Sequence, residues 1–272
     1  MPPCITQFKA AAFDLDGTLL QSDKTISPQT QAAIHQVAKA GVVTILATGR
    51  TLDTARKFHA DLQMKTPLIC YNGACVIEFP SGTELIHHKL SETISRTIVR
   101  YSREYGLALH ASMNHQLYFE PDSADANSYD ILSRTTGYTV DFDAIPDLRF
   151  TKAMYVGDES TIDQVRSRLE ADFPKSLYMV YSFKNYFEIM SIEASKRNAL
   201  EFVLRRYGIA AKDTVAFGDA ENDLDMLTYV GHGVAMGNAP AHVIEATQHR
   251  TASNDEEGVS KYLRQSDCLQ LI

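Results

Sequence analysis

The length, composition and charge of the chain limit the classes of protein to which it can belong. Its 272 residues, 44% of them hydrophobic and 22% charged, are enough to bury the core of one large domain or of two modest ones. The net charge of −8 argues against a general nucleic-acid binder, which presents a basic face to the phosphates. No run of 18 apolar residues occurs, and Met1–Thr6 lacks the features of a signal peptide. We therefore expect a cytoplasmic protein with no membrane or nucleic-acid partner.

The first third of the chain predicts alternating strands and helices. Short apolar runs that stop at polar or glycine residues indicate strands at 8–13, 42–47 and 68–70. Ser27 as N-cap, Pro28 in the first turn and Gly41 past the end predict a helix, and a second helix is expected over 52–62. This order is typical of βαβ units that form a parallel sheet.

The middle of the chain has an antiparallel α+β pattern. Strands are expected at 107–112, 116–120, 151–156, 177–181 and 186–190. Helices are expected at 91–105, near 126–134, and at 160–173, the last opened by a capping box at Ser160–Asp163. The apolar positions of Cys70 and Cys75, and the absence of a CxxC pair, indicate buried reduced thiols; Cys4 and Cys268 complete the count of four.

The last third returns to the α/β pattern. We expect a helix capped by Ser195 and ended by Gly208, a strand at 214–217, and a helix opened by Asp219–Asp223. A short strand at 233–235 and helices at 240–246 and 256–264 follow. The predicted fold class is therefore α/β, with a Rossmann-like parallel core formed by 1–83 and 191–272 and an α+β domain inserted at 84–190.

Polar clusters follow the predicted core strands. These clusters are Asp14–Thr18, Thr48–Arg50 and Asp219–Asp223, joined by Lys196 at a helix start. Because the carboxyl ends of parallel strands share one edge of a sheet, we expect the clusters to converge there. Carboxylates suit a hard cation such as Mg²⁺, whereas a lysine, a hydroxyl and backbone N–H groups suit a phosphoryl group. The sequence thus predicts a metal-plus-phosphate site.

Each of these residues also has a structural interpretation. Asp14 and Asp16 can act as carboxylate nucleophile and general acid/base, or they can simply form a calcium-like loop or a turn with Gly17. Asp219 and Asp223 share a helix face if a helix begins here, either as metal ligands or as acids favoured by the helix dipole. A hydroxyl such as that of Thr48 also serves as a plain N-cap, and an isolated lysine is commonly solvated.

The four clusters, in this order, resemble the four motifs of the haloacid-dehalogenase (HAD) superfamily. The matching segments are Phe13–Leu19, Thr48–Arg50, Lys196 and Gly218–Asp223. The insert occupies the position of a C2-type cap domain in that family. Gly237–Ala239 and Asn254–Val259 are similar to segments of its Cof-like subgroup. Arg197 departs from the pattern, because the family usually has glycine after the third-motif lysine.

The resemblance implies a role for each matched residue. Asp14 would form an aspartyl-phosphate and Asp16 would be the general acid/base. The implied Mg²⁺ set is Asp14, Asp16 through its backbone carbonyl, Asp219, and Asp223 supporting the ion from behind. The implied phosphate-binding set is Thr48, Gly49, Lys196 and Asn222.

These roles predict a Mg²⁺-dependent phosphatase that acts on a small soluble phosphomonoester, such as a sugar phosphate or a phosphorylated cofactor. A phosphomutase or phosphotransferase on the same site, or a non-catalytic phosphometabolite-binding protein, are the alternatives. Arg50 and Asn72 follow core strands and are candidates for contacting the leaving group. Candidates in the insert are His110, Asn114, His115, Lys184 and Glu188. We expect a monomer or a weak homo-oligomer.

Overall fold

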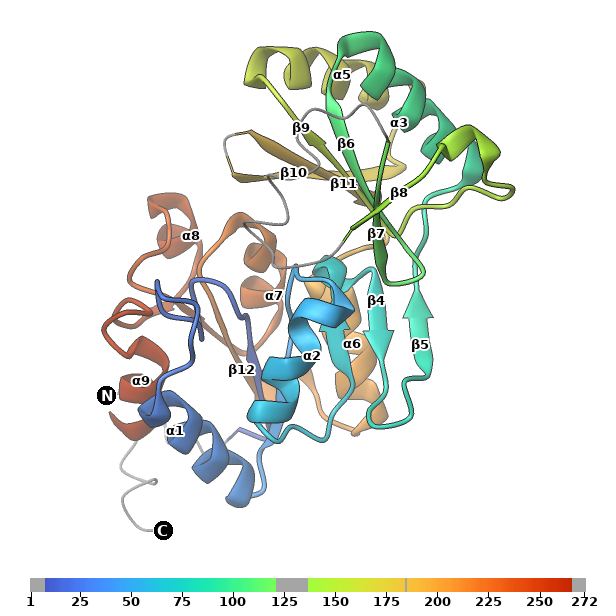
Figure 1. Ribbon diagram of the computed structural model, residues 1–272. Helices are drawn as coiled ribbons and strands as arrows, with labels where there is room; N and C mark the ends of the chain where they lie inside the picture. The colour runs from blue at the N-terminus through green and yellow to red at the C-terminus, as the bar shows by residue number, and fades with distance from the viewer. Residues whose placement is uncertain (1–7, 121–136, 184, 266–272) are drawn as a thin grey trace. The chain divides into compact units, whose positions relative to one another are not determined.

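The computed structural model describes residues 8–120, 137–183 and 185–265 (Figure 1). The chain forms two compact units. The core unit comprises Met1–Gly49, Ala55–Leu85 and Ser195–Ile272, and the insert unit comprises Arg50–Thr54 and Ile86–Ala194. The domain boundaries expected at 84 and 190 rest on sequence texture alone and stay predictions. The expected helix near 126–134, together with Cys4, Lys184, Cys268 and Met1–Thr6, lies outside the described residues.

A parallel sheet forms the centre of the core unit. Its strand order is β14 (His249–Arg250), β13 (His232–Ala235), β12 (Thr214–Gly218), β1 (Ala10–Phe13) and β2 (Val43–Leu46). Every neighbouring pair is parallel. Phe13 lies in register between Leu46 and Phe217, so the neighbouring strands β12, β1 and β2 end within one residue of one another. The predicted fold class, an α/β core with a parallel sheet and an additional mostly antiparallel sheet, is confirmed.

Helices accompany this sheet in the chain order that the sequence predicts. They are α1 (Pro28–Lys39), α2 (Leu52–Asp61), α6 (Lys196–Arg206), α7 (Leu224–Tyr229), α8 (Ala241–Ala246) and α9 (Gly258–Gln265). The side chain of Ser27 accepts a hydrogen bond from the Thr30 backbone N–H, which caps α1 as expected. In α1, Ala33, Ile34 and Val37 are buried, and the helix packs beside α9 (Figure 1).

A short antiparallel sheet in the order β3 (Leu68–Cys70), β4 (Cys75–Ile77), β5 (Glu84–His87) follows α2. The sequence predicts β3 but not β4 or β5, whose pairing depends on neighbours that the fold brings together. A parallel bridge between Ala47 and Ile69 places β3 next to the end of β2. Cys70 and Cys75 are buried free thiols opposite each other, which confirms the prediction for this pair.

The insert unit is built on a second sheet. Its order is β10 (Leu177–Phe183), β11 (Tyr186–Ser191), β9 (Lys152–Val156), β6 (Ala108–Met113), β7 (Gln116–Phe119) and β8 (Gly137–Thr139). Its pairs are antiparallel except β7 with β8. Helices α3 (Glu92–Tyr105) and α5 (Glu159–Asp172) bury apolar residues in the same cluster as the strands. Alternation along β9 turns Ala153 and Tyr155 into that cluster.

The predicted N-cap of α5 is wrong by two residues. Asp158, not Ser160, is the N-cap, and its carboxylate accepts from the Thr161 backbone N–H at 3.1 Å. Ser160 lies in the first turn and donates its hydroxyl to the same carboxylate at 2.5 Å. A carboxylate at this position also interacts favourably with the helix dipole, which a serine hydroxyl does not.

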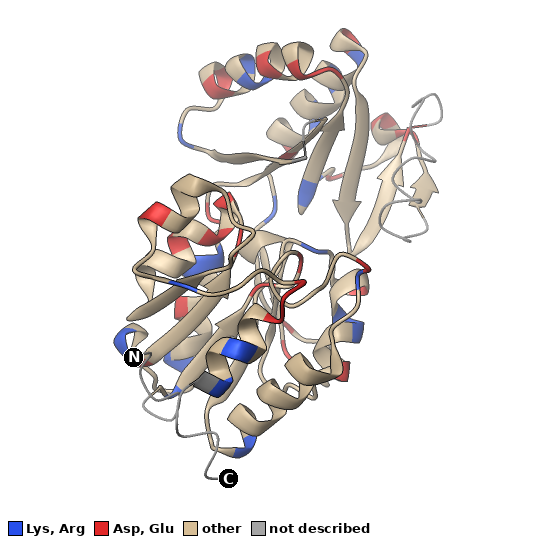
Figure 2. Cartoon of the chain, turned by 90° about the vertical axis from the view of Figure 1, so that its left-hand side faces the viewer, with Lys and Arg blue, Asp and Glu red and all other residues tan. Residues whose placement is uncertain are grey.

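Charged side chains are distributed according to this architecture. Strands β1, β2, β12 and β13 contain no Lys, Arg, Asp or Glu and are tan in Figure 2, whereas helices and loops carry both signs. Within the described residues, no helix combines the length and the apolar character that crossing a membrane requires.

Candidate active site

A buried lysine joins two acidic clusters in the core unit. The Lys196 ammonium donates to Asp14 Oδ1 at 2.6 Å and to Asp223 Oδ1 at 2.7 Å. Asp14 directly follows β1, and Lys196 is the first residue of α6, where the Ser195 side chain accepts from the Asn198 N–H and caps the helix. The structure therefore brings the first, third and fourth clusters together, as the parallel-sheet argument predicts.

The burial of these groups changes their proton affinity. Burial alone would lower the pKa of Lys196, but the Asp14 and Asp223 carboxylates raise it above its usual value, so the ammonium stays charged. Burial raises the pKa of Asp14 well above its usual value, and the Lys196 charge opposes that change. Burial and the neighbouring Asp223 raise the pKa of Asp219 to about 7. The cluster holds more negative charge than one ammonium offsets.

Asp223 lies at the end of a 3₁₀ turn (Glu221–Asp223), and α7 begins only at Leu224. The expectation that Asp219 and Asp223 share a helix face is therefore wrong. Asp223 Oδ2 instead accepts from the backbone N–H groups of Asp219 and Ala220, at 3.0 and 3.1 Å. With Lys196 on its other oxygen and no exposed surface, Asp223 organises the loop that carries Asp219.

Asp219 lies against the turn that follows β1. Thr18 Oγ1 donates to Asp219 Oδ1 at 3.1 Å. Gly17 has a φ of +77°, and a Cβ there would lie 2.2 Å from Asp219 Oδ2, so only glycine fits this close approach. Carboxylate oxygens of Asp14, Asp219 and Asp223 all lie within 4.8 Å of one another, a grouping that can hold a metal ion.

The second cluster is tied to the segment after β3. Thr48 is 1% exposed, its backbone N–H donates to Ile69 O at 2.9 Å, and its carbonyl accepts from Asn72 N at 3.1 Å. Gly49 lies so close to Asn72 that a Cβ on Gly49 would be 2.7 Å from Asn72 Oδ1. That oxygen accepts a hydrogen bond from Asn222 Nδ2 at 2.7 Å. Asn72 thus connects the second and fourth clusters, which its place in the sequence does not reveal.

The other two predicted site residues that follow core strands are Asp16 and Arg50. Asp16 is half-exposed, and Lys24 Nζ lies 3.7 Å from its Oδ1. Arg50 belongs to the insert unit although it lies only four residues beyond the end of β2.

Comparison with known proteins agrees with this geometry. A family model described as haloacid dehalogenase-like hydrolase matches residues 11–263. The chain belongs to the haloacid dehalogenase-like hydrolases. It is 29% identical to the protein YxeH of Bacillus subtilis over 93% of this chain and 96% of that protein. It is 28% identical to the HMP-PP phosphatase of Cronobacter sakazakii over 89% of this chain and 88% of that enzyme. The family and these relatives make it a phosphoric monoester hydrolase.

Solved structures of this hydrolase family share the fold. A haloacid dehalogenase-like hydrolase from Bacteroides thetaiotaomicron superposes with a TM-score of 0.86 at 26% identity, covering 95% of this chain and 99% of that one. A protein from Thermotoga maritima gives a TM-score of 0.84 at 28% identity, covering 95% and 97%. The match extends over nearly the whole chain in both cases.

The residue that departs from the family pattern is accommodated in this hydrolase by the helix. Arg197 occupies the second position of α6, where ordinary helical backbone needs no glycine, and its guanidinium lies 5.0 Å from the centre of the Tyr229 ring. The glycine that this region does require is Gly73, whose φ is +91° and where a Cβ would lie 2.2 Å from Ser195 O. The turn at Gly73 therefore packs directly on the start of α6, next to Lys196.

The insert unit of the hydrolase buries a separate ion pair. Lys152 Nζ lies 2.8 Å from Glu188 Oε1, with side chains 7% and 9% exposed. The sequence singled out Glu188 but missed Lys152, because its partner lies 36 residues away on another strand. His110 is buried edge-on against Phe119 at 4.8 Å between ring centres.

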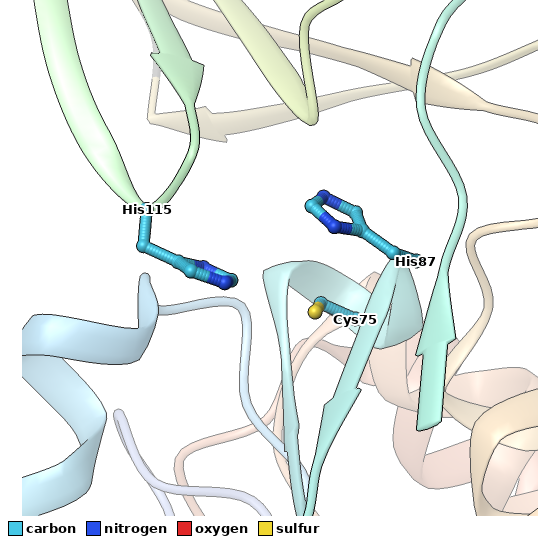
Figure 3. A group of neighbouring side chains, drawn as sticks. All are labelled: Cys75, His87 and His115. Atoms are coloured by element: carbon cyan, nitrogen blue, oxygen red, sulfur yellow. The ribbon is translucent and has the colours of Figure 1, made fainter. Parts of the chain in front are cut away.

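Two other candidates in the insert unit, Asn114 and His115, lie in the turn between β6 and β7. Asn114 is exposed, and the rings of His115 and His87 stack with centres 5.6 Å apart (Figure 3). His87 also hydrogen-bonds Thr151 Oγ1 at 2.8 Å. Cys75, drawn in the same view, belongs to β4 of the core unit.

Proposed function

We propose that the protein is a Mg²⁺-dependent phosphatase that hydrolyses small soluble phosphomonoesters, sugar phosphates or phosphorylated cofactors, through an aspartyl-phosphate on Asp14. The observation that carries the proposal is the buried Lys196 ammonium bridging Asp14 and Asp223, with Asp219 beside them. A carboxylate nucleophile for an anionic substrate needs such a positive charge next to it.

The donor set fits Mg²⁺. Three carboxylates gather around one ammonium, so the described cluster keeps a formal charge of about −2, which a divalent cation neutralises. Asp14, Asp219 and the Asp16 backbone carbonyl would hold the ion, and Asp223 would orient the Asp219 loop behind it. Bound Mg²⁺ supplies electrostatic stabilisation of the transferring phosphoryl group.

The chain's own residues carry the two displacements. A carboxylate oxygen of Asp14 attacks phosphorus, the P–O ester bond breaks, and Asp16 gives its proton to the leaving alkoxide. Asp16 then takes a proton from water, which attacks the phosphorus, and the Asp14 O–P bond breaks to release phosphate. Lys196 opposes the rise in the pKa of Asp14 that burial causes, and its charge therefore favours the ionised form that attacks in the first step and leaves in the second.

The phosphoryl oxygens would be held by Thr48, Gly49, Lys196 and Asn222, which lie on adjoining segments of the core unit. Asn72 fixes Asn222 through a 2.7 Å hydrogen bond, which supports a phosphate-binding role for that amide. Arg50 and Asn72 stay candidates for the leaving group. The relative from Cronobacter sakazakii is named an HMP-PP phosphatase, which supports phosphatase activity for this chain.

The test is a phosphate-release screen over phosphorylated metabolites with Mg²⁺ or with a chelator. We expect release that requires Mg²⁺ and disappears in Asp14→Asn. Turnover that survives chelation or that substitution contradicts the proposal. Transfer of the phosphoryl group to an added acceptor, in place of release, would favour the phosphotransferase alternative.

A further inference from the structure

We propose that Asn238 is a positioning residue for Asp219, holding this carboxylate against the turn that follows β1. The inference rests on the proposed function, because it takes Asp219 to be a magnesium ligand. Asn238 lies in the loop between β13 and α8, outside the four clusters that carry the chemistry.

One amide nitrogen makes both of the relevant contacts. Asn238 Nδ2 donates to the Gly17 carbonyl at 2.9 Å and to Asp219 Oδ2 at 3.3 Å. Thr18 Oγ1 holds the other oxygen of Asp219. Each oxygen of the carboxylate therefore has a donor, and both donors are anchored to the same Gly17–Thr18 turn, which lies three residues beyond Asp14.

The orientation of the Asn238 amide follows from its partners. The Asn254 backbone N–H donates to Asn238 Oδ1 at 3.1 Å. An N–H group can only donate and the Gly17 carbonyl can only accept, so the amide oxygen and nitrogen cannot exchange places. Asn254 is itself fixed by its Nδ2, which donates to Leu20 O at 2.7 Å. The contacts of Asn254 therefore orient the Asn238 amide so that its Nδ2 group donates to Asp219.

This arrangement orients Asp219 without changing the charge of the site. A neutral donor leaves the carboxylate its negative charge for the metal, while it removes the rotations that would turn Oδ2 away. Loss of a hydrogen-bond partner behind a metal ligand typically weakens metal binding by about 10–100-fold. Because Asn238 is exposed and its bond to Asp219 is long, we expect the lower end, about ten-fold.

The test measures Mg²⁺ affinity by isothermal titration calorimetry, without substrate, in wild type, Asn238→Ala and Ser22→Ala. Ser22 is the control, since its hydroxyl donates to Asp255 at 2.5 Å and so joins the chain after the Gly17–Thr18 turn to the segment at 254 without touching Asp219. We expect the dissociation constant to rise about ten-fold in Asn238→Ala and to stay unchanged in Ser22→Ala. Raising Mg²⁺ should restore most of the turnover of Asn238→Ala.

The outcomes separate this inference from the proposed function. Three outcomes would overturn the role of Asn238 and leave the proposed function standing. Asn238→Ala could bind Mg²⁺ as tightly as the wild type, or Ser22→Ala could lose as much Mg²⁺ affinity as Asn238→Ala. The third outcome is a loss of turnover in Asn238→Ala that saturating Mg²⁺ does not restore. Asp219→Asn distinguishes the larger failure. If the wild type binds no Mg²⁺, or Asp219→Asn binds it as tightly as the wild type, the proposed function and this inference both fall.

Discussion

The core unit and the insert unit each bury a lysine against carboxylates, but the charge balance differs. In the core, the Lys196 ammonium contacts Asp14 and Asp223 at 2.6 and 2.7 Å, and Asp219 lies beside them. In the insert, Lys152 and Glu188 lie 2.8 Å apart as an ion pair of opposite charges.

This difference separates a reactive arrangement from a structural one. Burying charge is costly unless partners offset it, and within the Lys152–Glu188 pair the two charges offset each other. The core cluster retains excess negative charge, and burial together with the nearby Asp223 raises the pKa of Asp219 to about 7. A buried cluster with excess negative charge attracts a cation.

The largest expected effect is on chemistry. Asp14→Asn should reduce phosphate release by roughly 10⁴-fold or more, because it removes the nucleophile while keeping the shape of the side chain. Glu188→Gln is the matched isosteric change in the insert unit and should leave measurable turnover. Steady-state assays of both variants on one substrate decide the matter; equal losses would erase the contrast between the two pairs.

Removing each lysine compares the two pairs in stability. Lys196→Met and Lys152→Met should each lower the free energy of unfolding by about 3–5 kcal/mol, because each leaves buried carboxylate charge without its ammonium. Added Mg²⁺ should stabilise Lys152→Met as much as the wild type, because both keep the core site, and should narrow the difference from the wild type only in Lys196→Met. Urea unfolding of the wild type and both variants with and without Mg²⁺ measures this, and an equal narrowing of the difference in both variants would argue against a cation site confined to the core cluster.

The pH dependence of stability should reveal Asp219. Its folded pKa of about 7 lies above the ordinary value of 3.8, so between these values the folded chain retains a proton that the unfolded chain has lost. Metal-free stability should therefore fall as the pH rises from about 4 to 7, with a slope of at most about 1.4 kcal/mol per pH unit from this group. Unfolding curves in a chelator at several pH values test this; Asp219→Asn should flatten the slope, and an unchanged slope in that variant would refute the assignment.

The smallest effect is expected when both members of the insert pair are replaced. Replacing a buried ion pair with apolar residues is often neutral, whereas removing one partner is costly. Lys152→Met combined with Glu188→Leu should thus be more stable than Lys152→Met alone and lie within about 1–2 kcal/mol of wild type. Denaturant unfolding of the wild type, both single variants and the double variant measures the coupling. A double variant less stable than either single one would show that the pair does more than balance charge.

Local signals explain what the sequence could predict of the fold. Ser27, Ser91 and Ser195 each cap a helix within three residues, so their effect is visible in the chain itself. The strands β4 and β5 escaped prediction because their pairing depends on neighbours brought by the fold. The cap of α5 was misplaced because Asp158 and Ser160 are both good caps, and only the folded backbone selects one.

The site divides in the same way. The clusters at Asp14, Thr48 and Asp219 are visible because residues that end parallel strands must meet at one edge. The Asn72–Asn222 and Asn238–Asp219 contacts are not visible, since neither asparagine is next to its partner along the chain. The sequence also did not show that the Asp223 carboxylate faces the backbone of the Asp219 loop, because a 3₁₀ turn and a helix start share the same residue preferences.

The sequence by itself therefore determined the fold class, the order of the clusters and the chemistry that their side chains can perform, because these follow from local patterns and functional groups. Only the tertiary structure decided which carboxylate faces which donor. Lys196 reaches Asp14 across 182 positions of the chain because α6 starts beside the end of β1, and packing over such separations is set by the whole fold. That packing gave one ammonium two carboxylate partners and left Asp219 to be held by Thr18 and Asn238.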